Sequence, residues 1–188
     1  MLLSKRRILW GLVFILLFSG GIAGGFFYFS ENFGSKPKGE AVPESQKQAE
    51  DSSFVRVYFP SEGRLIMEER RVKRLGSVTI SAEEIVKEFL KGPSNRGKSD
   101  VPPDAKILGL YFGTDGILYV DFSDEFRRNF HGDALSEFLL LKGLYESIIS
   151  NVAGVDDVKI LVEGKEMESI GGHLFILYPL KNSLTEVR

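Results

Sequence analysis

Hydrophobic residues form one long unbroken run near the N-terminus of the chain. Ile8–Phe29 covers 22 residues without a charged side chain, and Lys5, Arg6 and Arg7 stand directly before it. A helix of that length rises roughly 33 Å, which is enough to cross a hydrocarbon core of about 30 Å. Because positive charge collects on the cytoplasmic flank, the pattern predicts cytoplasmic residues 1–7, a single-pass transmembrane signal anchor, and an external remainder.

A cleaved signal peptide is the alternative interpretation of the same run. Its hydrophobic region would be Ile8–Phe18, with cleavage near the small residues Gly21 and Ala23. The apolar run continues past that point through Phe26–Phe29, which favours an uncleaved anchor. The chain contains no Cys, so anchoring through a lipidated cysteine is excluded.

Polar residues dominate between this run and the next hydrophobic pattern. In residues 30–53, which are rich in Ser, Glu, Lys, Gln, Gly and Pro, Phe33 and Val42 are the only large apolar side chains. Such a segment buries too little apolar surface to offset its chain entropy. We therefore expect a disordered linker at 30–53 and one folded extracytoplasmic domain at 54–188, close to the commonest domain size.

Alternating and helical periods divide the folded part into elements. Two strands are expected first, at Phe54–Phe59 and Arg64–Leu75, followed by a helix that begins at Ser81 with a capping box and stops at Gly92. The later elements are strands at Lys106–Phe112 and Ile117–Phe122, a long helix at Asp133–Asn151, a strand at Val158–Val162 and a further short strand at Phe175–Tyr178. The order ββαββαβ predicts an α+β domain, a mainly antiparallel sheet with two helices packed on one face.

Composition narrows the function classes further. The 24 Lys and Arg residues nearly balance the 26 Asp and Glu residues, which argues against nucleic acid as a partner. His131 and His173 are the only imidazoles, and they lack the spacing of metal ligands. Nucleophile-elbow, P-loop, zincin, EF-hand and dinucleotide motifs are all missing from the sequence. We therefore expect no enzyme activity, no metal and no cofactor.

One acidic and one basic cluster of residues each have a functional and a structural interpretation. Asp121, Ser123, Asp124 and Glu125 could bind a cation or do acid–base work, but a turn at the end of a strand explains them better. A basic concentration lies in the second strand, at Arg64, Arg70, Arg71, Lys73 and Arg74. A solvated strand edge is its default interpretation, and contact with an anionic partner through Arg70 and Arg74 is the sharper one.

Several short motifs, in this order and spacing, resemble the GerMN (sporulation and spore germination) domain of bacterial envelope proteins. The resemblance covers about residues 55–179. The residues that carry it are Val57–Pro60, Leu65–Arg70, Leu90–Ser94, Val101–Asp104, Tyr119–Ser123, Phe126, Gly132, Glu137, Val158–Gly164 and Gly171–His173.

The resemblance implies an α+β domain similar to ring-building motifs, with a role in binding or assembly and no established catalysis. Family members occur as lipoproteins or membrane-anchored proteins, some with two tandem copies of the domain. This chain departs from them in carrying a membrane helix in place of a lipidated Cys, and a single copy. A specific role in sporulation therefore does not follow from the resemblance alone.

Three functions are weighed on these grounds. The first is a non-enzymatic protein of the bacterial cytoplasmic membrane whose domain binds an envelope protein or assembles with itself, through contacts that include Arg70, Arg74, Tyr119 and Asp121. The alternative is a peptidoglycan- or glycan-binding module that stacks sugars on exposed tyrosines, for which the candidates are Tyr58, Tyr111 and Tyr119. An envelope hydrolase is the least favoured, and it would use Asp121, Asp124 or His131.

Overall fold

The structure is a computed structural model that describes residue 28 and residues 52–73, 76–94 and 99–185. Apart from Tyr28, the expected membrane helix at 8–29 lies outside these described residues, and so does the linker up to residue 51. No helix within the described part is long and apolar enough to cross a membrane. Ala49–Arg188 forms one compact unit, and the elements below belong to it.

An antiparallel hairpin opens this unit. β1 (Ser52–Ser61) pairs along its whole length with β2 (Arg64–Lys73), as the sequence pattern predicted. Alternation buries Val55, Val57 and Phe59 of β1 on one face. β2 carries most of its charged side chains to the surface, which suits the exposed strand of a two-stranded sheet.

Helix α3 (Val78–Leu90) follows the hairpin. Its N-cap is Ser77, whose hydroxyl accepts a hydrogen bond from the backbone N–H of Ile80, so the predicted start at Ser81 is wrong. Ser81 is buried within the helix instead. The predicted stop is confirmed, because the chain turns at Gly92 with φ of 72°, a conformation that favours glycine.

A second sheet holds four strands in the order β3-β4-β5-β6. The strands are β3 (Ile107–Phe112), β4 (Ile117–Phe122), β5 (Asp157–Val162) and β6 (Lys165–Glu166). β4 and β5 run parallel and the other two pairs antiparallel. The predicted α+β fold with mainly antiparallel pairing is confirmed, because only β4 and β5 run parallel among the described strand pairs. The predicted single sheet is wrong, because the first hairpin forms a sheet of its own and the long crossover returns the chain to the same end of the second sheet.

The expected last strand at Phe175–Tyr178 is also absent from the described structure, where this segment consists of bends and irregular backbone. Ile176 is fully buried while Phe175 and Tyr178 are exposed. A single buried side chain between exposed ones therefore gave this segment the apolar pattern of a strand. Beyond it, the described chain ends in the short helix α6 (Leu180–Thr185).

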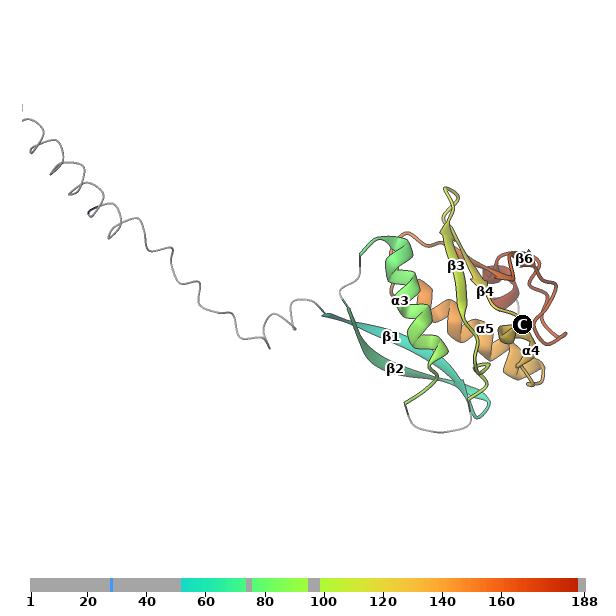
Figure 1. Ribbon diagram of the computed structural model, residues 1–188. Coiled ribbons are helices and arrows are strands. Elements are labelled where there is room, and N and C mark those ends of the chain that lie inside the picture. Colours follow the sequence, from blue (N-terminus) through green and yellow to red (C-terminus); the bar gives the residue numbers. More distant parts are fainter. Residues whose placement is uncertain (1–27, 29–51, 74–75, 95–98, 186–188) are drawn as a thin grey trace, which may run out of the picture. The chain divides into compact units, whose positions relative to one another are not determined.

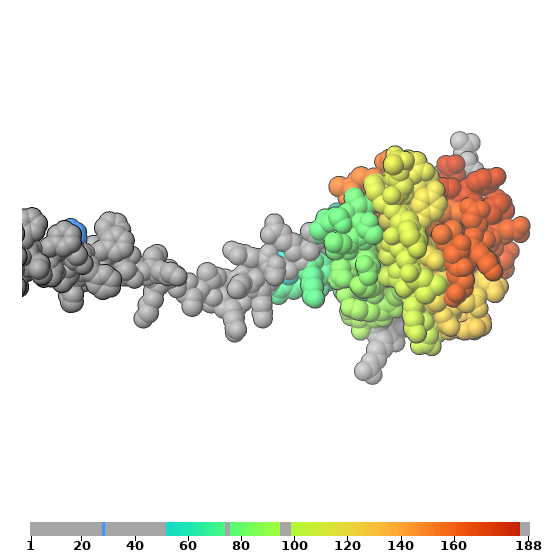
Figure 2. All heavy atoms as spheres, turned by 45° about the horizontal axis from the view of Figure 1, so that its top comes forward, coloured from blue at the N-terminus to red at the C-terminus, as the bar shows by residue number. Residues whose placement is uncertain are grey.

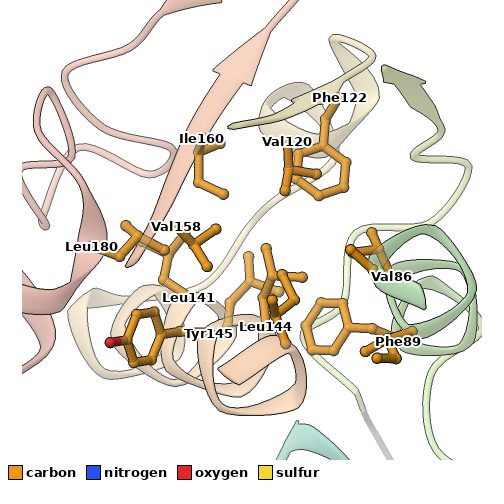
Figure 3. Packing of buried hydrophobic residues seen from close by; sticks show 14 of the residues in the cluster. Val86, Phe89, Val120, Phe122, Leu141, Leu144, Tyr145, Val158, Ile160 and Leu180 are labelled. Atoms are coloured by element: carbon orange, nitrogen blue, oxygen red, sulfur yellow. The ribbon is translucent and has the colours of Figure 1, made fainter. Parts of the chain in front are cut away.

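Helix α5 (Ala134–Ile149) is the centre of the unit, and the short α4 (Glu125–Arg128) precedes it. On one side α5 meets β1, where the backbone N–H of Tyr58 donates to the hydroxyl of Ser147 at 2.8 Å. On another side its Leu141 and Leu144 lie with Val158 and Ile160 of β5 in one hydrophobic core (Figures 1 and 3). A helix between two sheets must be apolar on more than one face, as its sequence is.

Candidate interaction surface

Three exposed apolar side chains gather on one short strand, β3. This strand ends the four-stranded sheet, and no strand of the described residues pairs with its other edge. Leu108 is 50% exposed, Tyr111 60% and Phe112 40%. Figure 1 shows the β3–β4 hairpin reaching out from the domain, and Figure 2 shows it at the surface beside α3. An edge of this kind offers unpaired N–H and C=O groups together with apolar side chains.

A groove of about 370 Å³ runs between α3 and the start of β3. Its apolar lining comes from Leu90, Ala105 and Ile107. Charged side chains also line it, namely Glu83, Glu84, Lys87, Glu88, Lys91 and Lys106. The lysines and glutamates of α3 are paired with one another, so the open apolar surface is the feature that a partner would gain from covering.

Two of the predicted contact residues lie on β4, behind this edge. Tyr119 is half-buried and stands in register between Tyr111 of β3 and Lys159 of β5. Asp121 is buried, and its Oδ1 accepts a hydrogen bond of 2.8 Å from the backbone N–H of Gly164. Asp121 thus holds the turn between β5 and β6, which is a different turn from the one expected at the end of its own strand.

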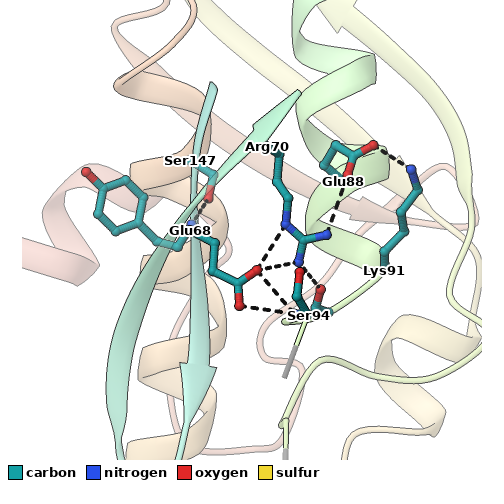
Figure 4. Close-up of polar contacts among 8 residues, drawn as sticks. Glu68, Arg70, Glu88, Lys91, Ser94 and Ser147 are labelled. Carbon is teal, nitrogen blue, oxygen red and sulfur yellow. Dashed lines mark hydrogen bonds and ion pairs between the residues drawn. The ribbon is translucent and has the colours of Figure 1, made fainter. Parts of the chain in front are cut away.

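Arg70 occupies a clamp between β2 and the end of α3 (Figure 4). Its Nη2 donates to Glu68 Oε2 at 2.7 Å and to the carbonyl of Gly92 at 2.8 Å, and its guanidinium lies 5.1 Å from the centre of the Phe59 ring. Burial would raise the pKa of Glu68, but hydrogen bonds from Ser94 and the charge of Arg70 outweigh it and lower that pKa.

The side chain of Arg70 is only 17% exposed, so most of its surface is already used within the domain. Arg74, the second basic residue of the predicted contact, lies outside the described residues. A partner contact through either arginine therefore stays a prediction.

A buried carboxylate on α5 organises the segment before α6. Glu137 is fully buried, and Ser169 Oγ and the N–H groups of Ile170 and Gly171 donate to its Oε1 at 2.8–2.9 Å. Its Oε2 accepts from the N–H groups of His173 and Leu174. Burial would raise the pKa of Glu137, but the hydrogen bonds, those of Gly171 and Ser169 first, lower it.

Sequence reasoning assigned no role to Glu137, which entered only as part of the family pattern. The sequence did contain a signal for this role: Glu137 is a single carboxylate among the Leu and Phe residues of the helix, and the glycine-rich segment Gly171–His173 follows later. A buried charge in such a stripe needs several donors, and a glycine-rich segment can supply them from its backbone.

The residues considered for catalysis do not converge in the described structure. Asp121 holds a turn, Asp124 pairs with Arg127 and Arg128, and His131 lines a polar cavity of about 440 Å³ that neither aspartate lines. No group of three or more His, Asp or Glu side chains within the described part is placed to hold a metal ion. These three candidates therefore do not form one site in the described part of the chain.

Comparisons with known proteins agree with this fold. A candidate lipoprotein of Clostridium perfringens has a solved structure with a TM-score of 0.50 and 23% identity, over 68% of this chain and 86% of that one. The tandem GerMN domains of the Bacillus subtilis sporulation protein GerM give a TM-score of 0.51 and 16% identity, over 70% of this chain and 47% of that one. These likenesses show the fold.

The family itself is shown by sequence. No curated protein matches the chain, but the family model named Germane, described as sporulation and spore germination, matches residues 56–168. The match runs from β1 through β5 and β6, and so includes the open edge of β3 and the buried Glu137. The chain therefore belongs to the Germane, or GerMN, family of sporulation and spore germination domains.

Proposed function

We propose that this protein is a non-enzymatic component of the bacterial cell envelope, whose GerMN domain binds a protein partner. The open edge of β3 with the groove beside it carries the proposal. Family membership supports a role of the sporulation or germination type. The apolar run at 8–29 would hold the domain at the outer face of the cytoplasmic membrane, and the likeness to a candidate lipoprotein suits a place at a membrane.

The physical basis is strand addition to an exposed sheet edge. An extended segment laid along β3 would satisfy backbone groups that otherwise face water, and its side chains would cover Leu108 and Phe112. The neighbouring groove would accept an apolar side chain between Leu90 and Ile107. Main-chain pairing supplies affinity in this mode, and the groove supplies specificity.

A photo-crosslinking residue at Tyr111, in the full-length protein in its own membrane, tests this function. Its side chain is 60% exposed on the edge strand, so we expect covalent adducts with a protein partner on illumination. The same residue at Met67, which is 50% exposed on β2, is the matched control and should give few adducts. Adducts that are equally rare at both positions would contradict the proposal.

Glycan binding is the second candidate, and it rests on exposed aromatic rings. Phe175 is 52% exposed and Tyr178 66%, with ring centres 6.0 Å apart, and Tyr111 adds a third open ring. Tyr58 and Tyr119, the other tyrosines considered for sugars, are half-buried. Purified cell wall should retain the protein, and Tyr178→Ala should release it, if this function holds; absence of retention ends it.

A further inference from the structure

The sequence of β3 would place matching side chains opposite each other if two copies of the strand paired antiparallel along their free edges. Regular pairing with β4 runs from Gly109 to Phe112, after a bulge at the start of the strand. Two copies of this strand, antiparallel about Leu110, place Leu110 opposite its own copy, Leu108 opposite Phe112, and Gly109 opposite Tyr111. We propose that the β3 edge binds the β3 edge of a second copy of this chain, forming a closed two-fold pair.

The first argument is apolar matching. Leu108, at the bulge, and Phe112, at the end of the strand, are both exposed, and the two-fold axis brings them together twice. The groove beside Ile107 and Leu90 opens next to the place that the second copy's Phe112 takes. The two-fold pairing thus covers both the exposed apolar side chains of β3 and the groove beside them.

The second argument concerns the outer face of the strand. A Cβ added to Gly109 would lie 2.6 Å from Tyr111 Oη, so the Tyr111 ring lies along its own strand over this glycine. In the proposed register each Tyr111 also faces a Gly109 of the second copy. A side chain at that position would crowd the ring, whereas glycine leaves room for both rings.

The third argument is charge. Lys106 stands just before β3, and Asp115 lies in the turn just after it; both are exposed. Antiparallel pairing about Leu110 brings the Lys106 of one copy toward the Asp115 turn of the other, so opposite charges meet at both ends. Parallel pairing would bring like charges together, and this difference favours the antiparallel two-fold arrangement.

This inference rests on the proposed function and names its partner as the chain itself. The chain has no Cys, so introduced cysteines report without background. In Leu108→Cys/Phe112→Cys the two cysteines are about 13 Å apart within one chain, beyond the roughly 7 Å reach of a disulfide. Between two paired copies they face each other twice.

The test oxidises this full-length variant in its own membrane and separates the products on a non-reducing gel. We expect one band at twice the monomer mass of 21.0 kDa, because two disulfides close the pair. The control Met67→Cys/Phe175→Cys, with exposed fractions of 50% and 52% off this edge, should remain monomeric. A ladder of higher oligomers, or an edge variant no more cross-linked than the control, overturns the two-fold pair.

The two proposals fail separately. Photo-adducts at Tyr111 with a different protein, together with no disulfide dimer, would leave partner binding in place and remove self-pairing. Because Leu108 and Phe112 are 50% and 40% exposed and lie outside the hydrophobic core, their replacement leaves the core intact, and the thermal unfolding midpoint of the reduced variant should match that of the parent within about 2 °C.

Discussion

At the scale of single residues, Glu137 is the side chain on which the most hydrogen bonds converge within the described domain. Glu137→Gln keeps the shape but puts an amide N–H₂ against backbone donors, so we expect a loss of about 2–3 kcal/mol in the free energy of unfolding. Urea denaturation of the Ala49–Arg188 fragment measures it. Glu146→Gln on the same helix breaks only a surface pair with Lys142 and should cost about 0.5 kcal/mol or less.

The same carboxylate sets a pH dependence. Because the folded state lowers the pKa of Glu137, its contribution is complete above the unfolded value of about 4.3 and is lost as the pH falls through the lowered pKa. The stability difference between the parent and Glu137→Gln should be constant from pH 8 to about pH 6. It should shrink below about pH 4. A difference that grows on acidification would contradict this sign.

Arg70 and Arg71 are neighbours on β2 with opposite surroundings. Arg70→Ala removes the donor to the Gly92 carbonyl and the cation over Phe59, and should lower the free energy of unfolding by about 1–2 kcal/mol. Arg71 is exposed and donates to Ser52 Oγ, so Arg71→Ala should change it by at most about 0.5 kcal/mol. If Arg70→Ala and Arg71→Ala lost equal free energy of unfolding, measured by heat and by urea, the contacts of Arg70 would not explain the stability of this region.

At the scale of elements, the contact between α5 and β1 depends on Gly143. A Cβ there would lie 2.6 Å from the carbonyl oxygen of Tyr58, so Gly143→Ala must push the helix from the hairpin. Overpacking of this kind costs about 1–3 kcal/mol, more than the roughly 1 kcal/mol that alanine gains in helix propensity. Gly76→Ala, whose nearest neighbour is Ile80 at 3.6 Å, should be nearly neutral in the same unfolding assay.

The pattern of apolar and polar residues predicts most helices and strands, but it does not predict that the strands form two separate sheets. Three predictions are confirmed: the hairpin of β3 and β4, the helix after Asp133 and the strand at Val158–Val162. Each follows from periodicity and turn chemistry, which act within a few residues. The parallel pairing of β4 with β5 depends on the path of a long crossover, which no local signal encodes.

The candidate surface was predictable to a smaller degree. The sequence indicated a structural role for Asp121 in the turn after its own strand, whereas the structure has Asp121 within β4, bonded to Gly164 of another turn. Arg70 looked solvated because its stacking partner Phe59 and its acceptor Gly92 lie on other elements. The edge position of β3 was hidden for the same reason, since strand order is a property of the whole sheet.

At the scale of the whole molecule, a tethered domain with one binding edge suits association in two dimensions. If residues 8–29 anchor each copy, copies share a thin layer at the membrane, and their effective concentration rises without any new contact. A weak edge-to-edge contact can then suffice. We therefore expect disulfide pairing of the Leu108→Cys/Phe112→Cys variant to be more complete in the membrane than for the Ala49–Arg188 fragment at equal total protein.

The anchor itself gives the last prediction. Each Arg placed at the centre of a membrane helix costs about 2.5–3.5 kcal/mol on the insertion scale, so Leu16→Arg/Leu17→Arg should move the protein from the carbonate-washed membrane pellet to the soluble fraction. Val42→Arg, in the expected linker, should leave it in the pellet. Mass spectrometry of the membrane-bound parent should find an intact N-terminus, because an anchor keeps the residues that a signal peptide loses. A mature form beginning near Gly24 would instead establish cleavage and leave the domain to reach its partner untethered.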